Sequence, residues 1–142
     1  MKRNSCRIIS LVSIAAMLAI GLVGCASSTV HQLESGERTA GAAGEIEITK
    51  DANGNQLVTV DVGHLPHPSD LAEDKSVYTV WLQPADSNQR YNMGQIRIDD
   101  DRAGNLAFTT PFDRFILKVT AEAQHNEERP SDQVVLRHGP SE

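Results

Sequence analysis

Residues 114–122 read RFILKVTAE, and this stretch decides the fold class. Phe115, Leu117 and Val119 alternate with other residues, and a period of two places apolar side chains on one face of a β-strand. Phenylalanine, isoleucine, valine and threonine also favour strands. The stretch therefore predicts a strand with one face in a hydrophobic core.

Six further runs of this kind lie on either side of it, bounded by glycine, proline, asparagine or aspartate. They cover Glu45–Thr49, Gln56–Val62, Ser76–Gln83, Tyr91–Asp99, Leu106–Thr110 and Gln133–Gly139. Seven short strands without an intervening helix predict an all-β fold, an antiparallel immunoglobulin-like β-sandwich over residues 45–139. An eight-stranded closed barrel is the alternative. We expect Trp81 at the centre of the core and a type I′ hairpin turn at Asn53-Gly54.

The N-terminus has the layout of an export signal. Lys2, Arg3 and Arg7 precede an uncharged apolar run, Ile8–Val23. A basic start followed by a short apolar segment is typical of a secretory signal peptide. The run is shorter than the roughly 20 residues that a membrane-spanning helix needs. We therefore predict a signal peptide over residues 1–24.

The apolar run ends in Leu22-Val23-Gly24-Cys25. This resembles the lipobox of bacterial lipoproteins, which implies cleavage between Gly24 and Cys25 and lipid on the Cys25 thiol. The alternatives are an ordinary signal peptide with a chance cysteine, or an uncleaved anchor. Two or three acyl chains hold a protein firmly on a membrane. Inner-membrane lipoproteins usually carry aspartate at the next position, so Ala26 implies a location outside the cytoplasm, on the outer membrane or cell surface.

Residues 25–44 are expected to form a lipidated, flexible tether, because they are small, polar and without apolar periodicity. A short helix around His31–Arg38 is the alternative.

Charge and cysteine content limit the function further. Three of the 13 basic residues and none of the 19 acidic ones precede Cys25, which leaves a net charge of −9 after cleavage. Such a surface repels polyanions, so we expect no nucleic-acid partner. Cys6 leaves with the signal and Cys25 carries lipid. The mature domain then has no cysteine for a disulfide, a thiolate zinc site or a blue-copper site.

Two loops carry candidate cation ligands. His64 and His67 flank Leu65-Pro66, and His125 and His138 are candidates to join them, since imidazoles suit transition metals. Asp99 and Asp101 have the spacing of the first calcium ligands in an EF-hand loop, although Ala103 replaces the third ligand. The bland interpretation, solvated surface residues and turns, is the one we adopt, so we expect no metal and no cofactor.

Enzyme motifs such as G-x-S-x-G and H-E-x-x-H do not occur in the sequence. We therefore expect no catalysis. The favoured hypothesis is a membrane-anchored binding or structural module of the cell envelope that contacts an envelope protein. The alternative is a cation-binding or sensory module that uses the loop histidines and aspartates.

Several strand motifs carry a second resemblance. They are Tyr78-Thr79-Val80-Trp81-Leu82, Met93-Gly94-Gln95-Ile96, Phe115-Ile116-Leu117-Lys118-Val119-Thr120-Ala121-Glu122, Pro130-Ser131 and Val134-Val135-Leu136. This region is similar to the extracytoplasmic C-terminal domain of anti-sigma-K factors and to related stand-alone bacterial sandwich domains. The resemblance implies a sandwich over Glu45 to about Gly139 and brings no catalytic residues. We expect no sigma-factor inhibition, since no sigma-binding domain is recognised.

Overall fold

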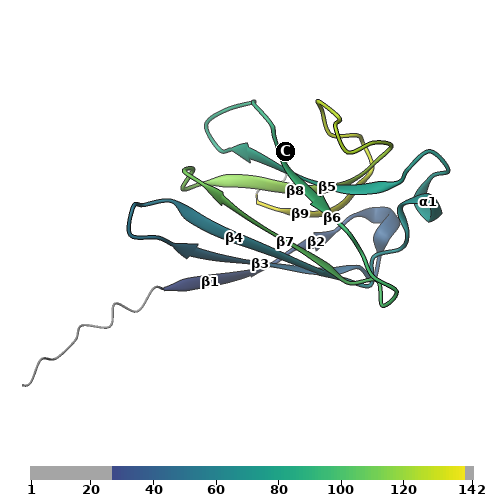
Figure 1. The fold of residues 1–142 in the computed structure, drawn as a ribbon, viewed down its shortest axis with the longest axis horizontal. Helices are drawn as coiled ribbons and strands as arrows, with labels where there is room; N and C mark the ends of the chain where they lie inside the picture. Colours follow the sequence, from purple (N-terminus) through teal and green to yellow (C-terminus); the bar gives the residue numbers. More distant parts are fainter. Residues whose placement is uncertain (1–26, 140–142) are drawn as a thin grey trace, which may run out of the picture.

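Residues 27–139, the part of the chain that the computed structural model describes, form nine strands in two antiparallel sheets (Figure 1). The first sheet contains, side by side, β1 (Ser28–Gln32), β3 (Ala43–Lys50), β4 (Gln56–Gly63) and β7 (Gly104–Thr110). The second contains β2 (Glu34–Ser35), β9 (Val134–His138), β8 (Phe115–Glu122), β5 (Val77–Pro84) and β6 (Tyr91–Ile96) in that order. The predicted all-β sandwich is confirmed. The predicted signal peptide, its cleavage site and the Cys25 lipidation site lie outside the described residues.

The predicted strand at 114–122 is β8, which lies between β9 and β5. Its Phe115, Leu117 and Val119 are buried between the two sheets. They pack with the alternating apolar residues of β3, β4 and β5, which are Ile46, Val58, Val60, Val62, Tyr78, Val80 and Leu82. The period of two thus fills a core between the sheets, which is the arrangement expected for a sandwich. The seven predicted strands match β3 to β9 with small shifts at their ends.

The predicted flexible tether over residues 25–44 is wrong for its described part. β1 pairs antiparallel with β3, and β2 pairs with β9. Leu33, between β1 and β2, is buried in the core, and its amide donates a hydrogen bond to the Gly44 carbonyl at 2.7 Å. The alternative helix around His31–Arg38 is only the 3₁₀ turn η1 (Glu37–Thr39). Both strands are exposed edge strands, so their sequence shows no apolar alternation to reveal them.

Trp81 is buried, at 2% exposure, but it is not at the centre of the core. Tyr78, Val80 and Leu82 of β5 occupy the core, so the intervening Trp81 lies on the outer face of the second sheet. Its Nε1 donates a hydrogen bond to Thr120 Oγ1 of β8 at 2.9 Å. The strand SVYTVWLQ has apolar residues on both of its faces. The face that carries Tyr78, Val80 and Leu82 is the one that packs into the core.

The predicted type I′ hairpin at Asn53-Gly54 is also wrong, because only Gly54 has a positive φ, 87°. The loop has three residues between Asp51 and Asn55, and the Asp51 carboxylate accepts hydrogen bonds from the Asn53 and Asn55 amides at 2.9 Å. This is a common three-residue hairpin loop in which one glycine takes the left-handed position.

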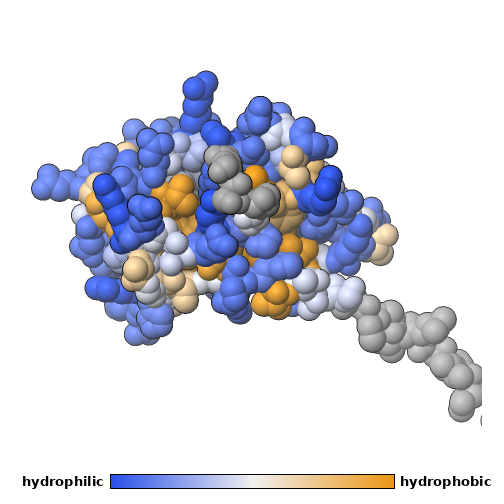
Figure 2. Space-filling view, turned by 180° about the vertical axis from the view of Figure 1, so that it is seen from behind, coloured by the Kyte–Doolittle hydropathy of each residue, from blue (hydrophilic) through white to orange (hydrophobic). Residues whose placement is uncertain are grey.

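The surface is largely hydrophilic, as the view from behind shows, with apolar side chains gathered toward the middle of that face (Figure 2). Among large apolar residues of the described chain, Val30 of β1 and Leu57 of β4 are the exposed ones, at 55% and 45%. Scattered exposed apolar residues of this kind are ordinary on soluble domains.

Candidate functional site

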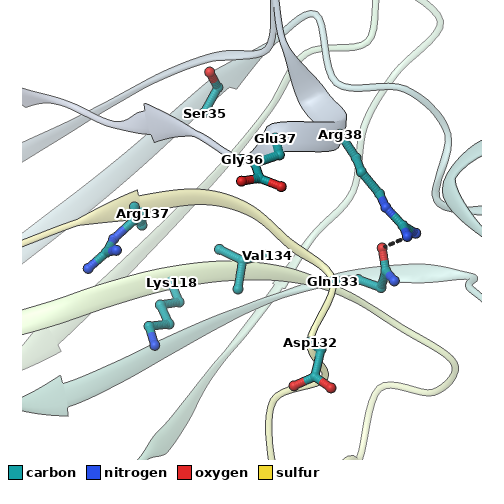
Figure 3. A pocket seen from close by; sticks show the side chains of 9 residues that line it. All are labelled: Ser35, Gly36, Glu37, Arg38, Lys118, Asp132, Gln133, Val134 and Arg137. Atoms are coloured by element: carbon teal, nitrogen blue, oxygen red, sulfur yellow. Dashed lines mark hydrogen bonds between the residues drawn. The ribbon is translucent and has the colours of Figure 1, made fainter. Parts of the chain in front are cut away.

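A pocket of about 520 Å³ lies on the outer face of the second sheet, where η1 approaches β8 and β9 (Figure 3). Two segments, residues 35–38 and 132–134, line it together with Lys118 of β8 and Arg137 of β9. Figure 3 shows the Lys118 and Arg137 side chains next to each other on neighbouring strands, with Glu37 and Arg38 on the opposite wall. One wall of the pocket is thus formed by residues 35–38, which belong to the segment predicted to be a tether.

Backbone contacts fix η1 against β9. The Gly36 amide and the Thr39 hydroxyl both donate hydrogen bonds to the Val135 carbonyl, at 2.9 Å and 2.8 Å. Thr39 is buried in this contact. A Cβ atom at residue 36 would collide with the Val134 carbonyl oxygen. Glycine is therefore required at position 36 for the wall of the pocket to form.

The pocket is lined mostly by charged and amide side chains. Lys118 and Arg137 are directly opposite each other in the β8–β9 register, and Arg38 donates a hydrogen bond from Nη1 to Gln133 Oε1 at 3.4 Å. Glu37 and Asp132 supply two carboxylates. Three basic and two acidic residues make this pocket more positive than the chain as a whole, whose net charge is negative. The arrangement suits a polar ligand that carries an acidic group.

A buried hydrogen-bond chain adjoins the pocket on the same face of the sheet. Thr120 Oγ1 accepts from Trp81 and donates to Glu122 Oε1, which also accepts from the Ser131 amide at 2.8 Å. The Ser131 hydroxyl in turn donates to the Ala121 carbonyl at 2.8 Å. Glu122 is only 2% exposed. These bonds hold the loop after β8 against the sheet and so position Asp132 and Gln133 at the pocket.

The predicted histidine pair lies at the end of the sandwich where α1 (Pro68–Leu71) is found. His64 and His67 are both exposed. His64 has a positive φ of 58°, and the His67 amide donates to Asp70 Oδ2 at 3.2 Å, which caps α1. His67 and His125 line a second pocket of about 520 Å³, so the structure brings these two histidines to one surface. His138 is not among the residues that line it.

Tyr78 also lines this pocket, and its hydroxyl donates a hydrogen bond to the Pro66 carbonyl at 2.6 Å. Burial raises the pKa of Tyr78 to about 12, and the nearby Asp70 carboxylate adds to the effect. The hydroxyl is therefore protonated at neutral pH and serves as a fixed donor that ties the loop before α1 to β5.

The predicted calcium ligands form a turn of their own. Asp99 Oδ1 accepts hydrogen bonds from the Asp101 and Ala103 amides at 3.0 Å and 2.9 Å, as Asp51 does in its hairpin loop. Within residues 27–139 the structure contains no group of three or more histidine, cysteine, aspartate or glutamate side chains placed to hold a metal ion. The four candidates His64, His67, Asp99 and Asp101 are thus not gathered into one site, so no observation favours a cation site in these loops.

A different histidine pair was missed in the sequence. His31 of β1 and His138 of β9 lie across the open side of the sandwich, with ring centroids 4.8 Å apart and planes tilted by 45°. Burial lowers the pKa of His138, the neighbouring His31 lowers it further, and Glu34 partly opposes them. His31 lies in the segment that the sequence predicts to be a tether. No spacing rule connects residues 107 positions apart, so the sequence carries no signal for this pair.

Comparison with known proteins adds no identity to this geometry: no protein family, no curated protein and no solved structure matches the chain. The resemblances to lipoproteins and to the anti-sigma-K outer domain therefore stay predictions. Of the helices in residues 27–139, none is long and apolar enough to cross a membrane.

Proposed function

We propose that this protein is an extracytoplasmic lipoprotein, anchored to a membrane through Cys25, whose β-sandwich is a binding or structural module of the cell envelope. The lipobox-like Leu22-Val23-Gly24-Cys25 at the end of a signal-like segment carries this proposal. β1 begins at Ser28, so only Ala26 and Ser27 separate the modified cysteine from the first strand. The folded domain is then held next to the membrane surface, without the long reach of a flexible tether.

The pocket between η1 and the β8–β9 pair is the proposed contact surface for an envelope partner. Its charged and amide lining supports a polar ligand that carries a carboxylate or another acidic group, which Arg38, Lys118 and Arg137 would bind. The resemblance to the anti-sigma-K outer domain supports an extracytoplasmic sandwich and nothing more specific.

Crosslinking in living cells tests this contact. A photo-crosslinking amino acid at Arg38 should give a discrete adduct, and Lys118→Glu in the same chain should reduce its yield at least tenfold. The same amino acid at Asp86, exposed on the loop after β5, is the matched control and should give no such adduct. Adducts of equal yield at both positions, or none at Arg38, would contradict a specific contact at the pocket.

A further inference from the structure

His31 and His138 lie where the edges of the two sheets come together. His31 is opposite Ile46 in the β1–β3 register, and His138 is opposite Leu117 in the β8–β9 register. Ile46 and Leu117 are both fully buried core residues. Residues opposite each other in register share a face of the sheet, so both histidines project from the core-facing sides of their sheets. They meet at the open side of the sandwich, next to solvent.

Their separation fits a shared metal ion. An imidazole nitrogen binds a zinc-like ion at about 2.0–2.1 Å, which puts the ring centroid about 3.2 Å from the ion. Two imidazoles at an angle of about 90–110° on one ion then have centroids about 4.5–5.2 Å apart. The observed 4.8 Å lies inside this interval.

The pair is also accessible to a cation. His31 is exposed, so an ion and its remaining water ligands can reach the pair from solvent.

Simple ring packing is the competing interpretation. The other ring pair in the described chain, Tyr91 and Phe112, lies at 5.6 Å and packs against the core. Both of its rings are six-membered carbon rings without a metal-binding nitrogen, and they pack against apolar neighbours. The histidine pair instead has one exposed and one half-buried member, and both rings carry nitrogen atoms that can bind a metal ion. Ring packing alone would be satisfied by phenyl side chains and does not require histidine at both positions.

We propose that His31 and His138 together bind one divalent transition-metal ion of the zinc, nickel or copper(II) class, with water in the other positions. Imidazole ligands suit these metals. The bound ion would connect β1, the strand that follows Cys25, to β9 of the other sheet, and so fasten the exposed edge strand to the body of the sandwich. This goes beyond the proposed anchoring and does not depend on lipid at Cys25.

Titration of the full chain without a polyhistidine tag, stripped with EDTA, tests the site with zinc alone. Calorimetry should give one ion per chain, and saturating zinc should raise the melting temperature by about 5 °C. His31→Asn and His138→Asn should each weaken binding at least tenfold. His64→Asn and His125→Asn, at exposed histidines elsewhere, should bind zinc as the wild type does. The melting temperature without metal reports whether each variant still folds.

Copper(II) gives a second readout that does not depend on any variant. Electron paramagnetic resonance of the wild-type chain with one equivalent of copper should show hyperfine coupling from two imidazole nitrogens. The absence of heat at about 1 mM zinc, coupling to a single nitrogen, or equal losses in the His64 and His125 variants would overturn the assignment.

Discussion

Thr79 and Thr120 lie directly opposite each other on β5 and β8, and both are fully buried. Thr120 Oγ1 bonds to Trp81 and Glu122, whereas Thr79 Oγ1 has no hydrogen-bond partner among the described residues. Thr120→Val should therefore destabilise the protein by about 1–3 kcal/mol, because the buried Trp81 Nε1 loses its partner and Glu122 Oε1 keeps only the Ser131 amide. Thr79→Val should be neutral or stabilising. Chemical denaturation of the two variants measures the difference, and equal effects would contradict the hydrogen-bond chain.

Arg102 holds the left-handed position of the turn between β6 and β7, with a φ of 62°. Its turn has the same hydrogen bonds as the Asp51 loop, in which Gly54 takes this position. A side chain in this conformation costs about 1–2 kcal/mol, more than the chain entropy lost with a glycine. Arg102→Gly should therefore stabilise the protein by about 0.5–1 kcal/mol, and Gly54→Ala should destabilise it by a similar amount. The urea concentrations at the unfolding midpoints of the two variants check both predictions. An Arg102→Gly protein less stable than the wild type would contradict backbone strain at Arg102.

Tyr78 gives the protein a stability that disappears in alkali. Its pKa rises from 10.0 to about 12 on folding, so the folded state retains the proton where the unfolded state loses it. This contribution is complete below pH 10 and is lost as the pH rises toward 12. The melting temperature of the wild type should fall more steeply over this interval than that of Tyr78→Phe. Tyr91→Phe is the matched control and should follow the wild type; a Tyr78→Phe curve parallel to the wild type would contradict the shift.

At the scale of elements, the attachment of η1 to β9 depends on Gly36. A methyl group there would collide with the Val134 carbonyl, which is backbone and cannot rotate away. Gly36→Ala should therefore cost about 1–3 kcal/mol, in the range of other overpacked substitutions. Gly63→Ala is the control, since a Cβ atom at that position meets nothing within 4 Å. Thermal unfolding compares the two, and a Gly36→Ala protein as stable as Gly63→Ala would show that η1 is not packed as described.

The strands that the sequence predicts are those that bury one face. Phe115, Leu117 and Val119 of β8 alternate because each second position must fill the core. β1 and β2 have no such requirement, because all their residues are exposed and their backbones pair with β3 and β9. Hydrophobic periodicity therefore could not find them. Periodicity also fails to place Trp81. Both faces of its strand are buried, so the sequence does not show which face packs into the core.

The candidate sites are harder to predict from the sequence than the strands are. The pocket combines Arg38, Lys118 and Arg137 from segments up to 99 residues apart, which are brought together by strand pairing and by the hydrogen bonds between η1 and β9. No local motif encodes such a set. The loop histidines and aspartates had recognisable spacing, but the hydrogen bonds of Asp99 and Asp70 show them stabilising a turn and a helix start. In these cases the spacing of the polar residues reflects their hydrogen bonds to nearby backbone amides in turns.

On the scale of the whole molecule, the proposed lipid anchor at Cys25 lies three residues before the first strand of the sandwich. The mass of the N-terminal peptide of the protein purified from membranes tests this most directly. We expect a peptide that begins at Cys25 and carries diacylglycerol on its sulfur, and we expect a Cys25→Ala chain to be uncleaved or released from the membrane. An unmodified Cys25 in a fully soluble wild-type protein would contradict it.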